Sequence, residues 1–268
     1  MAASIKNYIY TDQKNYPQKN WNIKSLIFVH LFVIFLLSTW YLPLTRTAWN
    51  LIDQQVFFLL NATLKHSFWQ NFWALANHKK TDWLHDVFML LFFFFYIKKA
   101  SDKKEKIQHA SELIASILFF ALTIFTINKT LVPNFFHLSR SSPSITYEGA
   151  IRLSQILDWL AIKDYSRCCF PADHGTTASL FVGTIYLLMG RKAGFIALLY
   201  GIFFCLPRLV VGAHFTTDIL IGSVPIALIA LGWAYLSPFF FHFTSIIAKI
   251  MHRALKLKGG NSNHEKFT

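Results

Sequence analysis

Cysteine is scarce in this chain of 268 residues. Its 3 cysteines, Cys168, Cys169 and Cys205, are too few and too unevenly placed for a disulfide framework. Because a disulfide between neighbouring residues is strained, we expect Cys168 and Cys169 to be free thiols. The chain also has no internal repeat and no linker rich in proline, glycine or serine. We therefore expect a single domain over residues 1–268.

Apolar residues, in contrast, are abundant. They make up 54% of the chain and include 28 phenylalanines, which is unlike an average soluble domain. Several stretches reach or approach the length of about 20 residues that crosses a bilayer. They predict an all-α, polytopic membrane protein with six transmembrane helices, at roughly 25–44, 83–98, 112–132, 175–190, 193–211 and 217–240. No small-residue cleavage site follows the first stretch, so we expect a retained anchor and not a removed signal peptide.

Acidic residues are outnumbered by Lys and Arg, 13 to 26, and the placement of the basic residues is informative. Four short segments carry nearly all of the net charge of +13, namely 1–24, 98–106, 191–192 and 249–268. They alternate with nearly neutral regions, as expected when Lys and Arg stay on the cytoplasmic side of a bacterial membrane. This pattern argues against a nucleic-acid partner. It predicts cytoplasmic termini and three outer loops, at roughly 45–82, 133–174 and 212–216.

The first outer loop contains an amphipathic segment. Apolar residues recur at helical spacing at Val56, Leu59, Leu60, Leu64 and Phe68, which indicates a helix lying in the outer interface of the membrane. Such a helix is either a structural flap over the bundle or a dock for a lipid head group. The pattern alone does not separate these two roles.

Charged residues gather at the outer ends of the predicted spans, where they are costly unless they serve a function. His214 and Asp218 in "RLVVGAHFTTD" are four residues apart and so share one face of a helix. The carboxylate can hold one ring nitrogen of His214 protonated and leave the other as a nucleophile. His174 in "FPADHG" stands at the start of the fourth span, where it can protonate a leaving oxygen. Its neighbour Asp173, taken alone, would be an N-cap for that helix.

Two guanidinium groups on the same predicted face suit the oxygens of a phosphate. Arg208 precedes His214 by six residues, and Arg140 lies in "LSRSSPS" on the second outer loop. Lys129 is a further basic candidate. Two Arg, two His and one Asp make a site for a phosphoryl group. Because these side chains all have such roles, we expect neither a metal site nor a cofactor.

These motifs resemble those of the type 2 phosphatidic acid phosphatase superfamily. Its third motif, S/P-R-x5-H-x3-D, matches at Arg208, His214 and Asp218. Its second, P-S-G-H, differs here because Ala172 and Asp173 stand in place of Ser and Gly. Its first, K-x6-R-P, is absent in that form. The resemblance implies a helical membrane enzyme that acts on a lipid phosphate.

Both departures point to the lipid A phosphotransferase branch, in which P-x-D-H replaces P-S-G-H. Stretches such as "RSSPSITY" and "KDYSRCCFPADHG" are similar to that branch, and the likeness runs from about Trp40 to Pro238. It implies transfer of a phosphate from undecaprenyl diphosphate to the 1-phosphate of lipid A, through a phosphohistidine, at the periplasmic face of the bacterial inner membrane. The implied roles are His214 as nucleophile, Asp218 as its orienter, His174 as acid, and Arg140 and Arg208 as phosphate ligands, with Asp173 and Lys129 as further candidates.

Two other functions remain compatible with the sequence. A lipid phosphatase would use the same residues with water as the acceptor, and only the departures in the first two motifs argue against it. The second is a membrane protein that binds or transports lipid without catalysis. This reading is disfavoured because a nucleophile, an orienter and an acid are all present.

Overall fold

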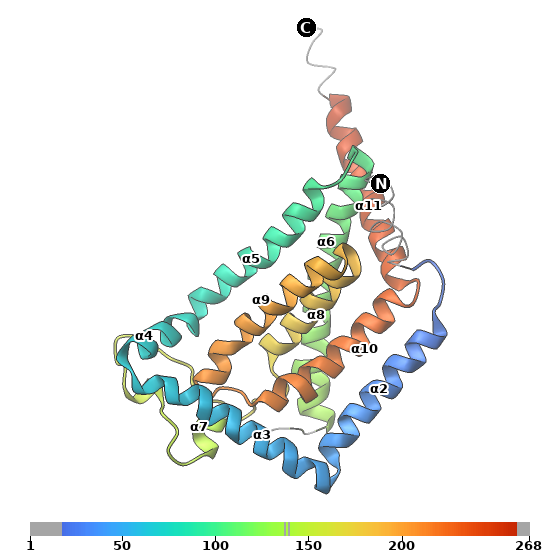
Figure 1. Ribbon diagram of the computed structural model, residues 1–268. Coiled ribbons are helices and arrows are strands. Elements are labelled where there is room, and N and C mark those ends of the chain that lie inside the picture. The colour runs from blue at the N-terminus through green and yellow to red at the C-terminus, as the bar shows by residue number, and fades with distance from the viewer. Residues whose placement is uncertain (1–17, 137, 139, 262–268) are drawn as a thin grey trace, which may run out of the picture.

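The computed structural model describes residues 18–136, 138 and 140–261, and within these residues it contains helices and no β-strand. The longer helices form a bundle, shown in Figure 1. In chain order the elements are α2 (Ile23–Tyr41), α3 (Pro43–Asn61), η1 (Ala62–Lys65), α4 (Ser67–Ala76), α5 (Lys79–Lys98), α6 (Lys103–Thr123), η2 (Ile124–Phe136), α7 (Pro143–Thr146), η3 (Leu153–Gln155), α8 (Asp173–Met189), α9 (Arg191–Val210), η4 (Asp218–Ser223), α10 (Val224–Tyr235) and α11 (Phe239–Asn261).

Local sequence signals set several of these helix boundaries. The side chain of Asn22 accepts a hydrogen bond from the backbone of Ser25 at the start of α2, and Asp102 does the same from Glu105 at the start of α6. Gly190, with φ of 84°, separates α8 from α9 in a conformation that favours glycine. α10 ends at Tyr235, shortly before Pro238, because the residue before a proline disfavours the helical conformation.

The core of the bundle lies between α8, α9 and α10. α8 packs along α9 on one side and against α10 on the other, while α6 packs against α11. Large apolar side chains such as Phe181, Ile185 and Tyr235 are fully buried there. Many phenylalanines on the outside are exposed instead, among them Phe28 and Phe35 on α2. An apolar exterior of this kind is typical of helices that face lipid.

Within the described residues, four helices are long and apolar enough to cross a membrane: Ile23–Tyr41, Lys103–Asn134, Arg191–Val210 and Asp218–Tyr235. The predicted spans 83–98 and 175–190 form α5 and α8, but α8 has only 17 residues and α5 carries Asp82, Asp86 and Lys98. The six-span count therefore stays a prediction. The predicted span 217–240 is divided, because α10 ends at Tyr235 and α11 begins at Phe239.

The first predicted outer loop forms two helices instead of one. α3 crosses the lower end of the bundle in Figure 1, and α4 follows after the short turn η1. Leu64 in that turn is fully buried, within an apolar cluster that includes Trp73 of α4 and Val210 of α9. This packing fixes both helices against the end of α9. Their position in a membrane interface stays a prediction.

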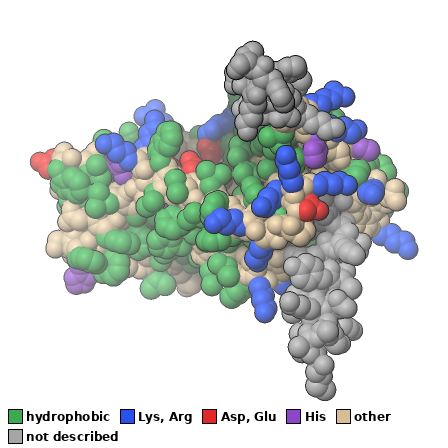
Figure 2. Space-filling view, turned by 90° about the horizontal axis from the view of Figure 1, so that it is seen from above, with side chains coloured by type: hydrophobic (Ala, Val, Ile, Leu, Met, Phe, Trp, Pro, Cys, Tyr) green, Lys and Arg blue, Asp and Glu red, His purple; other side chains and the backbone are tan. Residues whose placement is uncertain are grey.

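The connections between helices divide between the two ends of the bundle. The α5–α6 and α8–α9 connections and the end of α11 lie toward the upper part of Figure 1, whereas α3, α7 and the connection from α9 to η4 lie at the lower end. Figure 2 views the molecule from above and shows many Lys and Arg side chains there. The candidate site residues from the second and third predicted outer loops thus lie opposite the basic connections.

Candidate active site

The loop that carries Arg140 is held by backbone hydrogen bonds to chain far along the sequence. Cys169 donates its N–H to the carbonyl of Arg140 at 2.9 Å, and Ser144 donates to the carbonyl of Gly212 at 3.1 Å. Gly212 has φ of 76°, and a Cβ there would approach the side chains of Phe57 and Ser144 to within 3 Å. Only glycine suits this turn, which places His214 beneath the loop.

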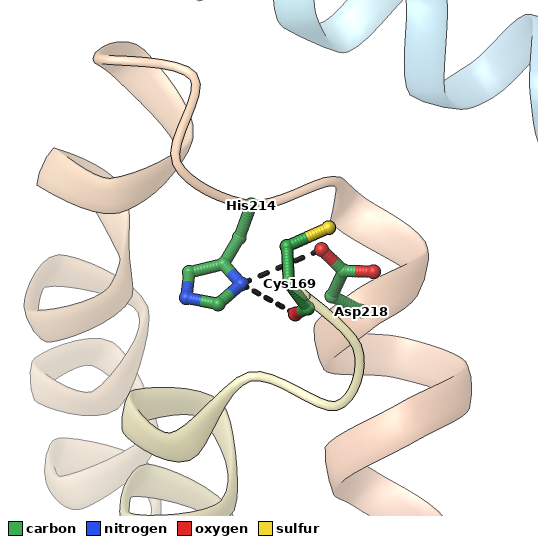
Figure 3. A group of neighbouring side chains, drawn as sticks. All are labelled: Cys169, His214 and Asp218. Atoms are coloured by element: carbon green, nitrogen blue, oxygen red, sulfur yellow. Dashed lines mark hydrogen bonds and ion pairs between the residues drawn. The ribbon is translucent and has the colours of Figure 1, made fainter. Parts of the chain in front are cut away.

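His214 has one ring nitrogen committed and one available. Nδ1 lies 2.8 Å from the backbone carbonyl of Cys169 and 3.4 Å from Oδ2 of Asp218. Because a carbonyl oxygen only accepts, Nδ1 carries the proton and Nε2 of the neutral ring carries the lone pair. Figure 3 shows the second ring nitrogen pointing away from both partners. The shorter of the two contacts is to the backbone, so Cys169 and Asp218 together orient the ring.

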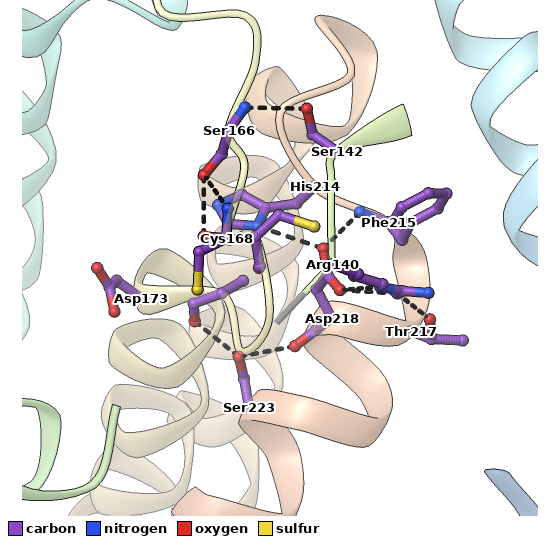
Figure 4. A network of polar contacts seen from close by, with 12 residues as sticks. Arg140, Ser142, Ser166, Cys168, Asp173, His214, Phe215, Thr217, Asp218 and Ser223 are labelled. Carbon is purple, nitrogen blue, oxygen red and sulfur yellow. Dashed lines mark hydrogen bonds and ion pairs between the residues drawn. The ribbon is translucent and has the colours of Figure 1, made fainter. Parts of the chain in front are cut away.

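Asp218 is fully buried at the first position of η4, a π-helical turn of the kind often found at functional sites. Its Oδ2 accepts the backbone N–H of Phe215 at 2.8 Å. Its Oδ1 accepts from Nε of Arg140 at 2.9 Å and from Nη2 at 2.7 Å. The carboxylate that faces His214 is therefore fixed from two sides (Figure 4).

Arg140 also contacts α3. Its Nη1 donates to Oδ2 of Asp53 at 3.3 Å, and its Nη2 donates to the hydroxyl of Thr217. That hydroxyl donates in turn to Asp53 at 2.6 Å, and the backbone N–H of Thr217 donates to Asp53 at 2.9 Å. Burial raises the pKa of Asp53, although hydrogen bonds from Thr217 and the charge of Arg140 act in the opposite direction. The guanidinium thus lies between two buried carboxylates.

A second polar group surrounds His174, at the start of α8. Nη2 of Arg208 donates to Nε2 of His174 at 2.9 Å and to the carboxylate of Asp82 at 2.9 and 3.2 Å. Nη1 of Arg208 donates to the backbone carbonyl of Asn77 at 2.7 Å and to its side-chain oxygen. These partners come from the start of α5 and the turn before it.

His174 has a hydrogen-bond partner in both its neutral and its protonated state. In the contact with Arg208, Nε2 is the acceptor, because a guanidinium only donates. The same nitrogen lies 3.4 Å from Oδ1 of Asp82, which can accept from a protonated ring. Both states of the imidazole therefore have a partner. This property suits a group that gives and takes a proton.

Asp173 and Lys129 form a third contact, separate from the two groups above. Their side chains make an ion pair, and Asn128 donates to the other carboxylate oxygen of Asp173 at 3.2 Å. Both charged side chains are well exposed, at 57% for Lys129 and 37% for Asp173. Figure 4 shows Asp173 pointing away from the Arg140–Asp218 pair. The pair joins the start of α8 to η2.

Close packing brings the start of α8 to the start of η4. Ser223 donates to the carbonyl of Ala172 at 2.7 Å, and the N–H of Ala172 donates to the carbonyl of Asp218 at 3.3 Å. A Cβ on Gly175 would lie 2.7 Å from the Ser223 hydroxyl, so this contact requires glycine. The histidines that follow Ala172 and precede Asp218 are thereby brought to the same end of the bundle.

One group of side chains in the described part of the chain has the composition of a metal site. The ligand atoms of Cys169, His214 and Asp218 lie within 4.8 Å of one another. However, Nδ1 of His214 carries a proton, and the carboxylate of Asp218 already accepts from Arg140 and Phe215. Burial and the neighbouring Asp218 also raise the pKa of the Cys169 thiol, whereas a metal ligand must be a thiolate. The arrangement favours a hydrogen-bonded histidine over a metal centre.

All three cysteines are free, which confirms the expectation for Cys168 and Cys169. Four site residues were missed by the sequence analysis: Asp53, Asn77, Asp82 and Thr217. Asp53 lies just before the amphipathic segment that begins at Val56, and Asp82 follows Lys79 and Lys80, which suggest a solvated turn. A usable signal was the scarcity of acidic residues, because with only 13 in the chain each one near the arginines is a candidate partner.

The seven predicted site residues thus fall into three contact groups. His214, Asp218 and Arg140 form one, His174 and Arg208 form another, and Asp173 with Lys129 forms the third. Their chemical roles stay predictions. What the geometry adds is a defined tautomer for His214 and a carboxylate partner for each arginine.

Comparison with known proteins defines the class of this molecule. The family model of the PAP2 superfamily matches residues 84–242, more than half of the chain, and the chain belongs to this superfamily. It is therefore an enzyme of the phosphotransferase and phosphatase kind, and the family predicted from the motifs is confirmed. With its apolar helices it is a multi-pass membrane protein.

One curated relative is more specific in its activity than the superfamily as a whole. The chain is 30% identical over 221 residues to the lipid A 1-diphosphate synthase of Escherichia coli (strain K12). The aligned region covers 81% of this chain and 89% of the relative. No solved structure matches the chain.

Proposed function

We propose that this enzyme transfers the terminal phosphate of undecaprenyl diphosphate to the 1-phosphate of lipid A, giving lipid A 1-diphosphate and undecaprenyl phosphate. The observation that carries the proposal is the similarity to lipid A 1-diphosphate synthase along most of both chains. The departure from P-S-G-H at Ala172 and Asp173 agrees with it. The two lipid substrates themselves follow from that resemblance.

In the first half of the reaction, Nε2 of His214 attacks the terminal phosphorus in line. A P–N bond forms while the P–O bond to undecaprenyl phosphate breaks, and protonated His174 gives its proton to the departing oxygen. Asp218 and the Cys169 carbonyl hold the ring and stabilise the positive charge that it gains. Arg208 stabilises charge on the equatorial oxygens, and Arg140 contributes from behind Asp218.

In the second half, an oxygen of the lipid A 1-phosphate attacks the phosphohistidine. The P–N bond breaks, a P–O bond forms, and His214 returns to its starting state. His174 acts as the base if the attacking phosphate still carries a proton. Because water competes for the same intermediate, the enzyme must hold the lipid phosphate in line.

The proposed location is the bacterial inner membrane, with both termini cytoplasmic, six spans and the site open to the periplasm. The test is labelling of introduced cysteines from outside in intact cells, in a variant whose exposed Cys168 is replaced by serine. Cysteines near Ser142 and Lys79 should be modified, and those near Lys103 and Arg191 should not. Labelling at Lys103 would contradict this orientation, because it rests on the alternation of basic segments.

The decisive experiment follows the phosphate. Purified protein in detergent receives undecaprenyl diphosphate labelled at its terminal phosphate, with and without lipid A, and His214→Ala protein is the control. Label on lipid A supports the transferase. Label found only in free phosphate, even with lipid A present, would replace the proposal with a lipid phosphatase.

A further inference from the structure

An apolar groove runs along the outside of the bundle beside His174 and Arg208. It has a volume of about 480 Å³ and is lined by one face each of α4, α5 and α9. Typical pockets for small ligands measure about 300–1,000 Å³. Its lining includes Phe72 of α4, Thr81, Leu84 and Phe88 of α5, and Tyr200 and Pro207 of α9. We call it the α4–α5–α9 groove.

One end of the groove meets the charged residues of the site. Thr81 directly precedes Asp82, and Pro207 directly precedes Arg208. The ring of Phe204 lies 5.3 Å from His174 and 4.8 Å from His85, which lines the groove. Phe204 thus contacts both a residue of the groove lining, His85, and the site residue His174. Figure 1 shows α5 and α9 running side by side away from α4 at that end.

The polar side chains of His85 and Tyr200 in the groove lining are hydrogen-bonded to each other. His85 is buried, and its Nδ1 is hydrogen-bonded to the hydroxyl of Tyr200 at 2.8 Å. That hydroxyl also contacts the backbone carbonyl of His85 at 3.2 Å. With these polar atoms paired, the surface offers mainly aromatic and aliphatic contacts. It suits a hydrocarbon chain whose polar end reaches Arg208.

We propose that the α4–α5–α9 groove holds part of the isoprenoid chain of the phosphate donor, with the donor's diphosphate at Arg208 and His174. The inference rests on the proposed function and adds the side from which the donor enters. A single groove fits the donor because undecaprenyl diphosphate has one chain, whereas lipid A carries several acyl chains. It also places the leaving phosphate beside His174, the group that protonates it.

The groove contributes to the reaction by positioning the chain of the donor, and hydrophobic burial adds little to its binding. A bilayer is as apolar as the groove, so moving a chain between them gains little from the hydrophobic effect. What the groove supplies is a fixed path that sets the phosphorus in line with His214. A misplacement of about 1 Å can cost on the order of a hundredfold in rate. A blocked groove should therefore harm long-chain donors and spare short ones.

The test fills the groove with an indole. Leu84→Trp places the ring inside it, and Leu90→Trp is the matched control, since Leu90 is a similarly exposed leucine of α5 that does not line the groove. We expect Leu84→Trp to lower kcat/KM for undecaprenyl diphosphate by about tenfold or more. Leu90→Trp should change it by less than about twofold. With a short-chain isoprenyl diphosphate, both variants should match the wild type.

Three outcomes would overturn the proposal: equal loss for both donors, no loss in Leu84→Trp, or a rise in KM for lipid A alone. A second readout, binding of undecaprenyl phosphate without turnover, should weaken in Leu84→Trp only. If binding weakens in Leu84→Trp only, but the wild-type protein transfers no phosphate, the proposed role of the groove is supported and the proposed function is wrong. If it transfers phosphate and both tryptophan variants behave alike, the function stands and the groove fails.

Discussion

Arg140 and Arg208 are both paired in this structure, but with different partners. Arg140 lies between Asp218 and Asp53, whose side chains are 0% and 2% exposed. Arg208 pairs with the carboxylate of Asp82, whose side chain is 34% exposed. A buried carboxylate keeps its arginine, because either charge alone in that place would be costly. An exposed carboxylate can turn to solvent and leave its arginine to a phosphate.

The difference suggests a division of labour between the two contact groups. Around His214, one arginine and two carboxylates favour the positive charge that the ring acquires when it is phosphorylated. Around His174, the arginine and the start of α8 favour an anion. We therefore expect Arg140 to act through Asp218 as a positioning residue, and Arg208 to contact the substrate. Four measurements test this division between the two arginines.

The strongest test is on the two histidines. His214→Ala should lower turnover by at least about 10³-fold, because it removes the nucleophile, and labelled donor should leave no label on the protein. His174→Ala should lose about 10²–10⁴-fold, the usual contribution of a general acid or base. Thermal unfolding serves as the folding control. Label retained on His214→Ala protein would show that another residue is phosphorylated, and the proposed difference between the two contact groups would be wrong.

The next test exchanges each arginine for lysine. Arg140→Lys cannot reach both Asp218 and Asp53, and each hydrogen bond lost from a charged group costs about 1.5–3 kcal/mol. We expect a lower unfolding temperature and a lower kcat with little change in KM. Arg208→Lys should instead raise the KM for the donor and lower the unfolding temperature less than Arg140→Lys does, because its carboxylate partner Asp82 is partly exposed. The opposite assignment of KM and stability effects would reverse the roles proposed for the two arginines.

A smaller and more diagnostic effect is expected for Asp82→Asn. The change removes the anion that competes with phosphate for Arg208, so the KM for the donor should fall. It also removes the negative charge that favours a protonated His174, so kcat should fall by about tenfold, most clearly where proton transfer limits the rate. Asp86→Asn, four residues along α5, is the control. A fall in stability with unchanged KM would show that Asp82 is only structural.

Much of this architecture could be predicted from the sequence, because apolar runs and i, i+4 spacing are local signals. The four confirmed long apolar helices follow from composition, and the pairing of His214 with Asp218 follows from one turn of helix. α5 and α8 were also found, although their polar ends shorten the apolar stretch.

The partners of the arginines could not be predicted, because they come from segments distant in sequence. Asp53 reaches Arg140 across 87 positions, and Asp82 reaches Arg208 across 126. No periodicity encodes such contacts. Nor did the sequence indicate that the backbone carbonyl of Cys169 would orient His214, since every residue has a carbonyl. The break between α3 and α4 was missed because the apolar spacing continues through Leu64.

The smallest expected effect concerns the choice between lipid and water. Asp173 is one of the two positions at which this sequence departs from P-S-G-H, and its carboxylate is paired with Lys129 and Asn128 instead of the two histidine groups. We propose that this pair orders the acceptor side of the site. An exposed ion pair contributes only about 0.2–1 kcal/mol, so Asp173→Gly should shift the ratio of phosphorylated lipid A to free phosphate by up to about fivefold toward free phosphate. The ratio is measured with labelled donor at saturating lipid A.

Lys129→Ala should cause a similar shift, and the double variant should shift the ratio no further, because both changes break the same contact. Additive shifts would show that the two residues act separately, and an unchanged ratio in all three variants would remove the pair from any account of how the phosphohistidine avoids water.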